Sequence, residues 1–353
     1  MKKTYTMKNT INDIASDEFL VKRMFSMITK DIIDMVPEEL RDSELGILRE
    51  KLRMPWGVPY LSDALVDIAN LIYDICYEDK YETVRLWSDK VEQNYFPMCD
   101  NDENFVSLIR FKDSFKEERP MALIVPGGAY QEIAMPNEGM EIAKELAGKG
   151  YAVSILMYRV RPNRYPLPQT DLAMAVKYLR SHASEFGVKN QIMTVGFSAG
   201  GHLVASEACY SDKINQEVMK KLENQQSDLY DRYKDISVKP EQVCMAYPVI
   251  NCQSDNHEDS YINLTGGGDS MRQEMSIDCN VTSDFPKAFV WACDDDGLVP
   301  SSNAKRMYEK LQNVGVESEL HIYPTGDHGI GVGIGTSAEG WIDSLVRFMK
   351  GIQ

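Results

Sequence analysis

The sequence predicts an α/β fold, in which helices cover both faces of a mostly parallel central sheet, with a helical extension at its N-terminus. From about residue 105, short apolar runs typical of buried strands alternate with segments whose apolar residues recur at helical spacing. Strands that are apolar throughout indicate a sheet covered on both faces. Before residue 100, by contrast, helical spacing dominates. We therefore expect a helical extension over residues 1–100 and an α/β domain over residues 101–353.

The N-terminal part shows helical periodicity from about residue 13 to residue 90. Its clearest apolar stripe runs from Leu61 to Ile75, and Ser62 is expected to cap that helix. Such a stripe is typical of a packing face and not of a ligand site. We expect the extension to cap the α/β domain, to dock on it, or to join two copies of the chain into a homodimer.

The α/β domain is expected to supply the strands of the sheet, with amphipathic helices between them. Apolar runs place these strands at 105–109, 121–125, 151–157, 192–195, 243–249, 287–293 and 319–323. The polar stretch 211–240 is expected on the surface or in a cap, and residues 251–283 are expected to be irregular. Ligands of such sheets bind beyond the carboxyl ends of the strands, so we expect functional residues just after them.

Composition and charge narrow the classes of partner. The formal net charge of −16 disfavours nucleic acid and anionic membranes, which require basic patches. No apolar run is long enough for a membrane span, and no apolar segment of a secretory signal follows the N-terminus. The 7 cysteines are an odd number without a Cys-x-x-Cys pair, which predicts incidental thiols in a reduced, cytoplasmic protein and no metal site.

The segment Gly196-Phe197-Ser198-Ala199-Gly200 has the pattern Gly-x-Ser-x-Gly between an apolar run and a helical segment. This is the pattern of a nucleophile elbow, in which a serine on a sharp strand-to-helix turn exposes its hydroxyl. A side chain at either glycine would collide with the neighbouring strand or helix. The motif is weakly specific by itself, so the prediction depends on an acid and a histidine that follow it in the chain.

Ser198 needs a base, because a serine hydroxyl is a weak nucleophile. Among 5 histidines, His328 follows a strand and lies between glycines, so we expect it to accept the serine proton. His202, on the helix after the elbow, is expected to pack instead. The three aspartates at positions 294–296 follow an earlier strand, and their position alone leaves open which one orients the histidine.

An oxyanion hole requires two backbone N–H donors aimed at the reacting carbonyl. We expect one from Ala199, the residue after the nucleophile, and the other from Gly128 in the glycine-rich turn after the second predicted strand. The neighbouring Gly127, Ala129 and Tyr130 are expected to border the substrate, although Tyr130 could equally pack in the core.

Five motifs in this order resemble the α/β-hydrolase esterases grouped as acetylxylan or feruloyl esterase-like enzymes, which are related to esterases of the hormone-sensitive-lipase type and to kynurenine formamidases. The motifs are Pro126-Gly127-Gly128-Ala129-Tyr130, Arg164-Tyr165-Pro166-Leu167-Pro168 with Asp171, Gly196-Phe197-Ser198-Ala199-Gly200-Gly201-His202, Asp295-Asp296-Gly297-Leu298-Val299-Pro300 and Gly326-Asp327-His328-Gly329. The resemblance covers about residues 105–352, and its Asp-x-x-Val-Pro pattern selects Asp296 as the acid. The first motif departs from the His-Gly-Gly-Gly pattern of the hormone-sensitive-lipase group, and the first hundred residues lie outside the family pattern.

The resemblance implies an α/β-hydrolase fold and a serine carboxylesterase that uses Ser198, His328 and Asp296 through an acyl-enzyme, with no metal or organic cofactor. It implies a small-molecule acyl ester as substrate, and acetyl groups on plant-derived oligosaccharides are the family-based expectation. Two alternatives stay open. The same residues would serve an amide hydrolase, such as an arylformamidase or a peptidase, and the fold could be a ligand-binding scaffold without activity.

Overall fold

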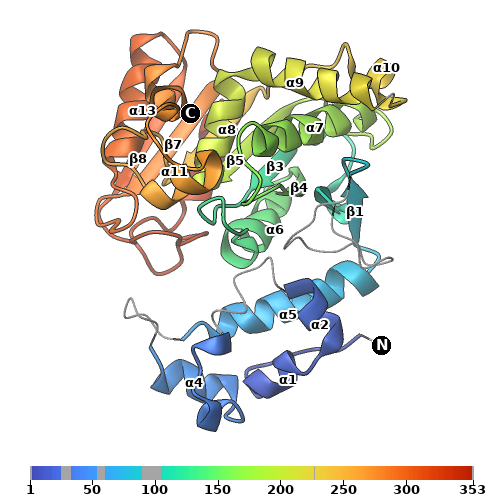
Figure 1. The fold of residues 1–353 in the computed structure, drawn as a ribbon, viewed down its shortest axis with the longest axis vertical. Helices are drawn as coiled ribbons and strands as arrows, with labels where there is room; N and C mark the ends of the chain where they lie inside the picture. Colours follow the sequence, from blue (N-terminus) through green and yellow to red (C-terminus); the bar gives the residue numbers. More distant parts are fainter. Residues whose placement is uncertain (1, 25–32, 54–59, 90–104, 226, 352–353) are drawn as a thin grey trace.

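The computed structural model describes residues 2–24, 33–53, 60–89, 105–225 and 227–351. Figure 1 shows a central sheet flanked by helices, with the N-terminal helices gathered in a layer of their own at the lower end of the view. Among the described residues, that layer contains α1 (Ile11–Ala15), α2 (Glu18–Met24), α4 (Leu45–Lys51) and α5 (Ser62–Tyr77).

The sheet has eight strands in the order β1-β2-β4-β3-β5-β6-β7-β8 among the residues described. The strands are β1 (Tyr81–Arg85), β2 (Ser107–Phe111), β3 (Met121–Val125), β4 (Ala152–Met157), β5 (Ile192–Phe197), β6 (Gln242–Ala246), β7 (Lys287–Cys293) and β8 (Ser318–Tyr323). β2 runs antiparallel to both β1 and β4, and the remaining pairs are parallel. The carboxyl ends of β3, β5, β6, β7 and β8 therefore meet at one edge of the sheet.

Helices cover both faces of this sheet. Those of the α/β part are α6 (Glu141–Gly148), α7 (Leu167–His182), α8 (Ala199–Cys209), α9 (Ser211–Asn224), α10 (Leu229–Tyr233), α11 (Glu258–Thr265), α12 (Arg272–Met275), α13 (Ser302–Asn313) and α14 (Trp341–Lys350), with a π-helical turn η3 (Met135–Met140) before α6. α7 packs against α8 and α9. An ion pair between Lys149, after α6, and Asp343 of α14 links those two helices. The predicted α/β fold with helices on both faces is confirmed.

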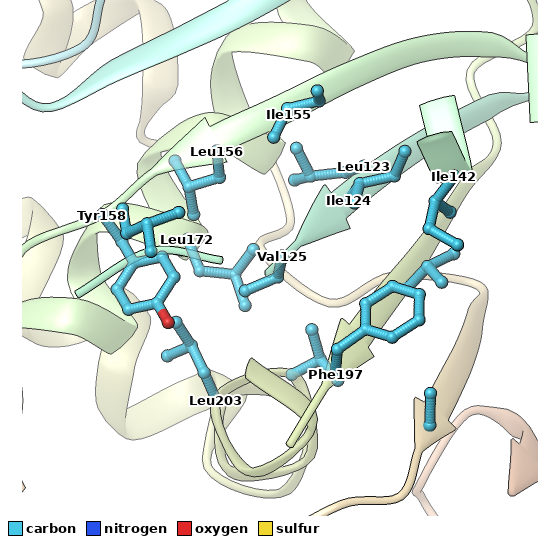
Figure 2. Packing of buried hydrophobic residues seen from close by; sticks show 14 of the residues in the cluster. Leu123, Ile124, Val125, Ile142, Ile155, Leu156, Tyr158, Leu172, Phe197 and Leu203 are labelled. Atoms are coloured by element: carbon cyan, nitrogen blue, oxygen red, sulfur yellow. The ribbon is translucent and has the colours of Figure 1, made fainter. Parts of the chain in front are cut away.

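The core lies between the parallel strands and these helices (Figure 2). β3 supplies Leu123, Ile124 and Val125, whose side chains are fully buried among residues of β4, α6, α7 and α8. Burying an aliphatic side chain of this size contributes about 1.5–3 kcal/mol. This packing fixes the end of β3, where the glycine-rich turn begins, next to the end of β5, where the elbow begins.

The N-terminal layer agrees with the predicted helices in part. The expected stripe on α5 is buried at Leu65, Ile68, Ile72 and Ile75. Ser62, however, is not the N-cap: Leu61 holds that position, and the Ser62 hydroxyl donates to the Leu45 carbonyl at 2.7 Å. The Ser62 hydroxyl is buried and needs an acceptor, so it bonds to a carbonyl of the neighbouring helix α4 and does not cap its own helix.

Residues 81–85 form a strand, although helical spacing was expected up to about residue 90. Tyr81, Thr83 and Val84 are residue types that favour strands, and β1 pairs antiparallel with all of β2. The sheet thus begins before residue 100, while the division of the chain at that point stays a prediction. The polar stretch 211–240 contains α9 and α10, and 251–283 contains α11 and α12.

Further expectations concerned cysteines, metals and membranes. Cys76 on α5 is disulfide-bonded, so the expectation of incidental thiols throughout is wrong for this residue. Within the described ranges, no group of three or more acidic, cysteine or histidine side chains is placed to hold a metal ion. None of the helices that the structure describes has the length and apolarity needed to cross a membrane.

Candidate active site

The predicted elbow is present between β5 and α8. Ser198 follows the strand with φ 51° and ψ −119°, a conformation that side-chain-bearing residues rarely adopt. A Cβ at Gly196 would lie 2.3 Å from the Gly200 carbonyl oxygen, and one at Gly200 would lie 2.2 Å from the Val125 carbonyl oxygen. Both positions therefore require glycine, for the steric reason that the motif predicts.

Three side chains from distant parts of the chain form a continuous hydrogen-bonded series. His328 Nε2 lies 2.8 Å from Ser198 Oγ, and His328 Nδ1 lies 2.7 Å from Asp296 Oδ2. The Asp296 side chain is fully buried, and that of His328 is 12% exposed. This is the arrangement in which a histidine can accept a serine proton while a carboxylate holds the other ring nitrogen in its protonated form.

The three consecutive aspartates have three different sets of contacts. Asp294 Oδ1 accepts hydrogen bonds from the Ser301 hydroxyl and the Lys305 ammonium, both at 2.8 Å. Asp295 Oδ1 accepts the backbone N–H groups of Gly326 and Asp327, just before the histidine, both at 2.9 Å. Only Asp296 among them reaches the imidazole. The structure therefore places the acid that the Asp-x-x-Val-Pro pattern selects beside His328.

In the glycine-rich turn after β3, one backbone N–H is bonded within the protein and the next, at the cavity, is unbonded in the described part of the chain. The Gly127 N–H donates to Glu138 Oε2 at 2.7 Å and is thus unavailable to a substrate. The N–H groups of Gly128 and Ala199 have no acceptor among the residues that the structure describes. Gly128 has φ +118° and borders the same cavity as Ser198. These two amides are therefore free to hold a developing oxyanion.

The remaining two residues of the predicted substrate border behave differently. Ala129 lines the cavity, and its carbonyl oxygen accepts the Asn263 amide at 2.9 Å. Tyr130 is 1% exposed, and its hydroxyl lies 2.8 Å from His202 Nδ1. The packing alternative left open for Tyr130 therefore fits its position.

His202 packs as expected. Burial lowers its pKa to about 4, so the ring is neutral near pH 7. His202 Nε2 lies 2.9 Å from the Met275 carbonyl oxygen, which can only accept, so this nitrogen carries the proton and Nδ1 accepts the Tyr130 hydroxyl.

A cavity of about 770 Å³ lies over Ser198 and His328, and the N-terminal layer forms one of its walls. The layer contributes Arg49, Tyr60, Leu61, Asp63, Ala64, Asp67 and Ile68 to the lining. Burial raises the pKa of Asp67 and of Glu141, and the charge of Asp67 raises that of Glu141 further. The lining thus carries the carboxyl groups of Asp63, Asp67 and Glu141, which can accept hydrogen bonds, together with the cation of Arg49, which pairs with Asp63 at 3.1 Å.

Sequence reasoning did not identify several polar residues of this cavity, among them His257 and Glu138. His257 caps α11 and lines the cavity, and burial lowers its pKa. Glu138 lies on η3, where neither periodicity nor a short motif marks it. A histidine before an acidic helix start and a glutamate soon after a glycine turn are common patterns, so only the tertiary contacts separate these residues from solvated ones.

Comparison with known proteins gives relatives named as a xylanase and as an esterase. The chain is 28% identical over 231 residues to Endo-1,4-beta-xylanase B of Butyrivibrio fibrisolvens, covering 64% of this chain and 34% of the xylanase. It is 29% identical over 217 residues to the Acetylxylan esterase of Xylanibacter ruminicola, covering 59% of this chain and 40% of that protein. The chain therefore spans well under half the length of these two relatives.

Solved structures extend the comparison to the fold. The acetyl ester-xyloside bifunctional hydrolase from Caldicellulosiruptor lactoaceticus superimposes with a TM-score of 0.65 at 26% identity, covering 77% of this chain and 96% of that one. This likeness confirms the α/β-hydrolase fold that the motifs imply. The family model described as BD-FAE matches residues 109–311, which are more than half of the chain, and the protein therefore belongs to the BD-FAE family.

Proposed function

We propose that the protein is a serine carboxylesterase that hydrolyses short-chain acyl esters, chiefly acetyl esters of plant-derived oligosaccharides. The observation that carries the proposal is the hydrogen-bonded series from Ser198 through His328 to Asp296 at the floor of a cavity. The names of two relatives, an acetylxylan esterase and an acetyl ester-xyloside hydrolase, support the acetyl ester as the substrate class.

In the proposed reaction, His328 Nε2 takes the proton of Ser198 Oγ while that oxygen bonds to the acyl carbon. The carbonyl oxygen becomes an oxyanion and accepts the N–H groups of Gly128 and Ala199. When the carbon–oxygen bond to the alcohol breaks, the imidazolium gives its proton to the departing oxygen. Water then attacks the acyl-serine with the same histidine as base, which releases the carboxylic acid and restores the serine.

We also propose that the N-terminal layer is a cap that limits which alcohols fit. This proposal is supported by the cavity, whose lining combines Ser198 and His328 with Ala64, Asp67 and Ile68 of α5. The carboxyl groups of this wall suit a hydroxyl-rich alcohol, because hydroxyl groups donate hydrogen bonds to them.

The composition predicts a cytoplasmic protein, whereas the disulfide at Cys76 favours an oxidising compartment. Homodimer formation through the extension also stays a prediction.

The mechanism is tested by the Ser198→Ala variant. Hydrolysis of p-nitrophenyl acetate should fall by at least about 10³-fold, because no other hydroxyl replaces the nucleophile. Thermal unfolding should match the parent, since a methyl group fits where the serine stands. A fluorophosphonate probe should label the parent chain and not the variant.

Two results would contradict the proposal. Undiminished ester hydrolysis by Ser198→Ala would exclude the acyl-serine, and failure of the folded parent to react with the probe would favour a scaffold without activity. Parallel rates on acetylated xylo-oligosaccharides, formyl amides and aminoacyl substrates rank ester against amide hydrolysis, and faster amide cleavage would reverse the proposed preference.

A further inference from the structure

A buried carboxylate outside the triad lies beside the proposed oxyanion hole. Glu138 of η3 is 3% exposed and borders the cavity that contains Ser198. Its Oε2 accepts the Gly127 N–H at 2.7 Å, and its Oε1 accepts the Tyr247 hydroxyl at 3.0 Å. A carboxylate removed from water requires such partners. Glu138 thereby links the glycine-rich turn after β3 to Tyr247, which follows β6.

Tyr247 carries this link on to the loop of the catalytic histidine. Its ring packs edge-on against the His328 imidazole, with centroids 4.9 Å apart, and its hydroxyl also accepts the Gly331 N–H at 3.3 Å. The neighbouring Asn137 amide donates to the Gly329 carbonyl oxygen at 2.6 Å. Two consecutive residues of η3 thus position the His328 loop. Asn137 bonds to its backbone, and Glu138 bonds to the tyrosine whose ring packs on the imidazole.

The glycine-rich turn leaves little space between Glu138 and the nucleophile. A Cβ at Gly127 would lie 2.8 Å from Glu138 Oε2, 2.9 Å from Ser198 Cβ and 2.7 Å from the Phe197 carbonyl oxygen. The carboxylate, the turn and the elbow are therefore packed in direct contact. Glu138 takes the Gly127 N–H, whereas the next amide of the turn, that of Gly128, has no acceptor among the described residues.

Charge gives Glu138 a second effect on the histidine. Burial raises the pKa of its carboxyl, whereas a charged His328, the Gly127 N–H and the Tyr247 hydroxyl lower it. The interaction between the two charges is reciprocal, so an ionised Glu138 also favours the imidazolium. The other titratable groups around His328 are Asp296 at Nδ1, the preceding Asp327, and His257 on the lining of the cavity.

We propose that Glu138 is a positioning residue that holds the glycine-rich turn and the His328 loop in register and stabilises the imidazolium formed when Ser198 loses its proton. The inference rests on the proposed esterase function. If Glu138 had only a structural role, its replacement would change stability or the level of activity and would leave the pH dependence of activity unchanged. The pH profile therefore separates the two roles.

The test uses the full chain and three variants. Glu138→Gln keeps the shape and removes the charge, Tyr247→Phe keeps the charge and removes the hydroxyl that bonds to both Glu138 and Gly331, and Glu145→Gln removes an exposed charge on α6 as the matched control. For each, kcat and KM for p-nitrophenyl acetate are measured from about pH 5 to pH 9, where an essential histidine titrates. Thermal unfolding is measured in parallel.

The expected result is a loss confined to catalysis. Glu138→Gln should lower kcat by about 10- to 100-fold with KM within about twofold, because the imidazolium loses a nearby negative charge and the Gly127 N–H keeps only a neutral, weaker acceptor. The acid limb of its kcat/KM profile should move to lower pH by about one unit, since a nearby negative charge is lost. Tyr247→Phe should lower kcat less and keep the parental acid limb, and Glu145→Gln should match the parent.

A Glu138→Gln variant with the parental acid limb would overturn the electrostatic role, and one that also keeps the parental kcat would overturn the inference entirely. If that variant does not fold, Glu138→Asp decides, because aspartate keeps the charge but is too short to reach both partners. Its kcat should fall, and a parental kcat would exclude positioning. Activity in Ser198→Ala would instead defeat the esterase mechanism itself, so the two failures are distinguishable.

Discussion

The Asp296→Asn substitution tests which ring nitrogen of His328 must carry the proton. Asp296 Oδ1 accepts the backbone N–H groups of Leu298 and Val299 at 2.9 and 2.8 Å, while Oδ2 faces His328 Nδ1. In the variant, the amide oxygen must stay with the two backbone donors, because an NH₂ group there would oppose them. The amide nitrogen then faces Nδ1 and donates to it.

This forced orientation determines the size of the effect. A donor at Nδ1 moves the imidazole proton to Nε2, and His328 can then no longer accept the Ser198 proton. Loss of the correct tautomer in a serine triad lowers kcat by about 10⁴-fold, and we expect about 10³- to 10⁴-fold here. The corresponding loss of transition-state stabilisation is about 4–5.5 kcal/mol.

The assay is kcat for p-nitrophenyl acetate, with thermal unfolding as the check of folding. Asp294→Asn and Asp295→Asn are matched controls, because both remove a charge within two residues but neither side chain touches the imidazole. Each should keep kcat within about tenfold. The reasoning is refuted if Asp296→Asn keeps more than a tenth of the parental kcat, or if either control loses more activity than it does.

Two further predictions concern the cap and the core. Ala64→Trp, which adds bulk to the α5 wall of the cavity, should raise KM for acetylated xylo-oligosaccharides about tenfold and leave p-nitrophenyl acetate nearly unaffected; equal effects on both substrates would contradict the cap. Glu207 is fully buried, neither carboxyl oxygen has a partner among the described residues, and burial raises its pKa from 4.5 to about 8. The folded state therefore holds a proton that the unfolded state releases above its own pKa, so the contribution to stability is complete below about pH 4.5 and is lost as pH rises towards 8. By calorimetry, Glu207→Gln should be more stable than the parent near pH 8, on the order of 3 kcal/mol, with the difference disappearing near pH 4.5; a difference independent of pH would contradict this.

Much of the fold followed from local patterns. The alternation of apolar runs and helical stripes predicted the parallel strands and the helices between them, and the comparisons confirm the α/β-hydrolase fold. β1 was missed because a five-residue strand at a sheet edge has too little alternation to stand out from helical spacing. Its structure depends on pairing with β2, which periodicity within the segment does not report.

Parts of the candidate site followed from the sequence in the same way. Gly196, Ser198 and Gly200 form the expected elbow, since the sterics of that turn involve near neighbours. His328 and Asp296 lie where the chain order and the Asp-x-x-Val-Pro pattern place them, while their catalytic roles stay predictions. Gly127 was expected to border the substrate, but its N–H is taken by Glu138, a partner on a different element.

The sequence by itself determined the parallel strands of the sheet and the sharp turn at Ser198, because these depend on side-chain periodicity and on contacts within a few residues. The tertiary structure brings Asp296, which the Asp-x-x-Val-Pro pattern had selected, to the imidazole, and it alone decided that Glu138 joins the glycine-rich turn to the histidine loop and that α5 walls the cavity. Each of these depends on atoms from segments far apart in the chain, whose distances are set by how the sheet stacks its strands and not by the residues on either side.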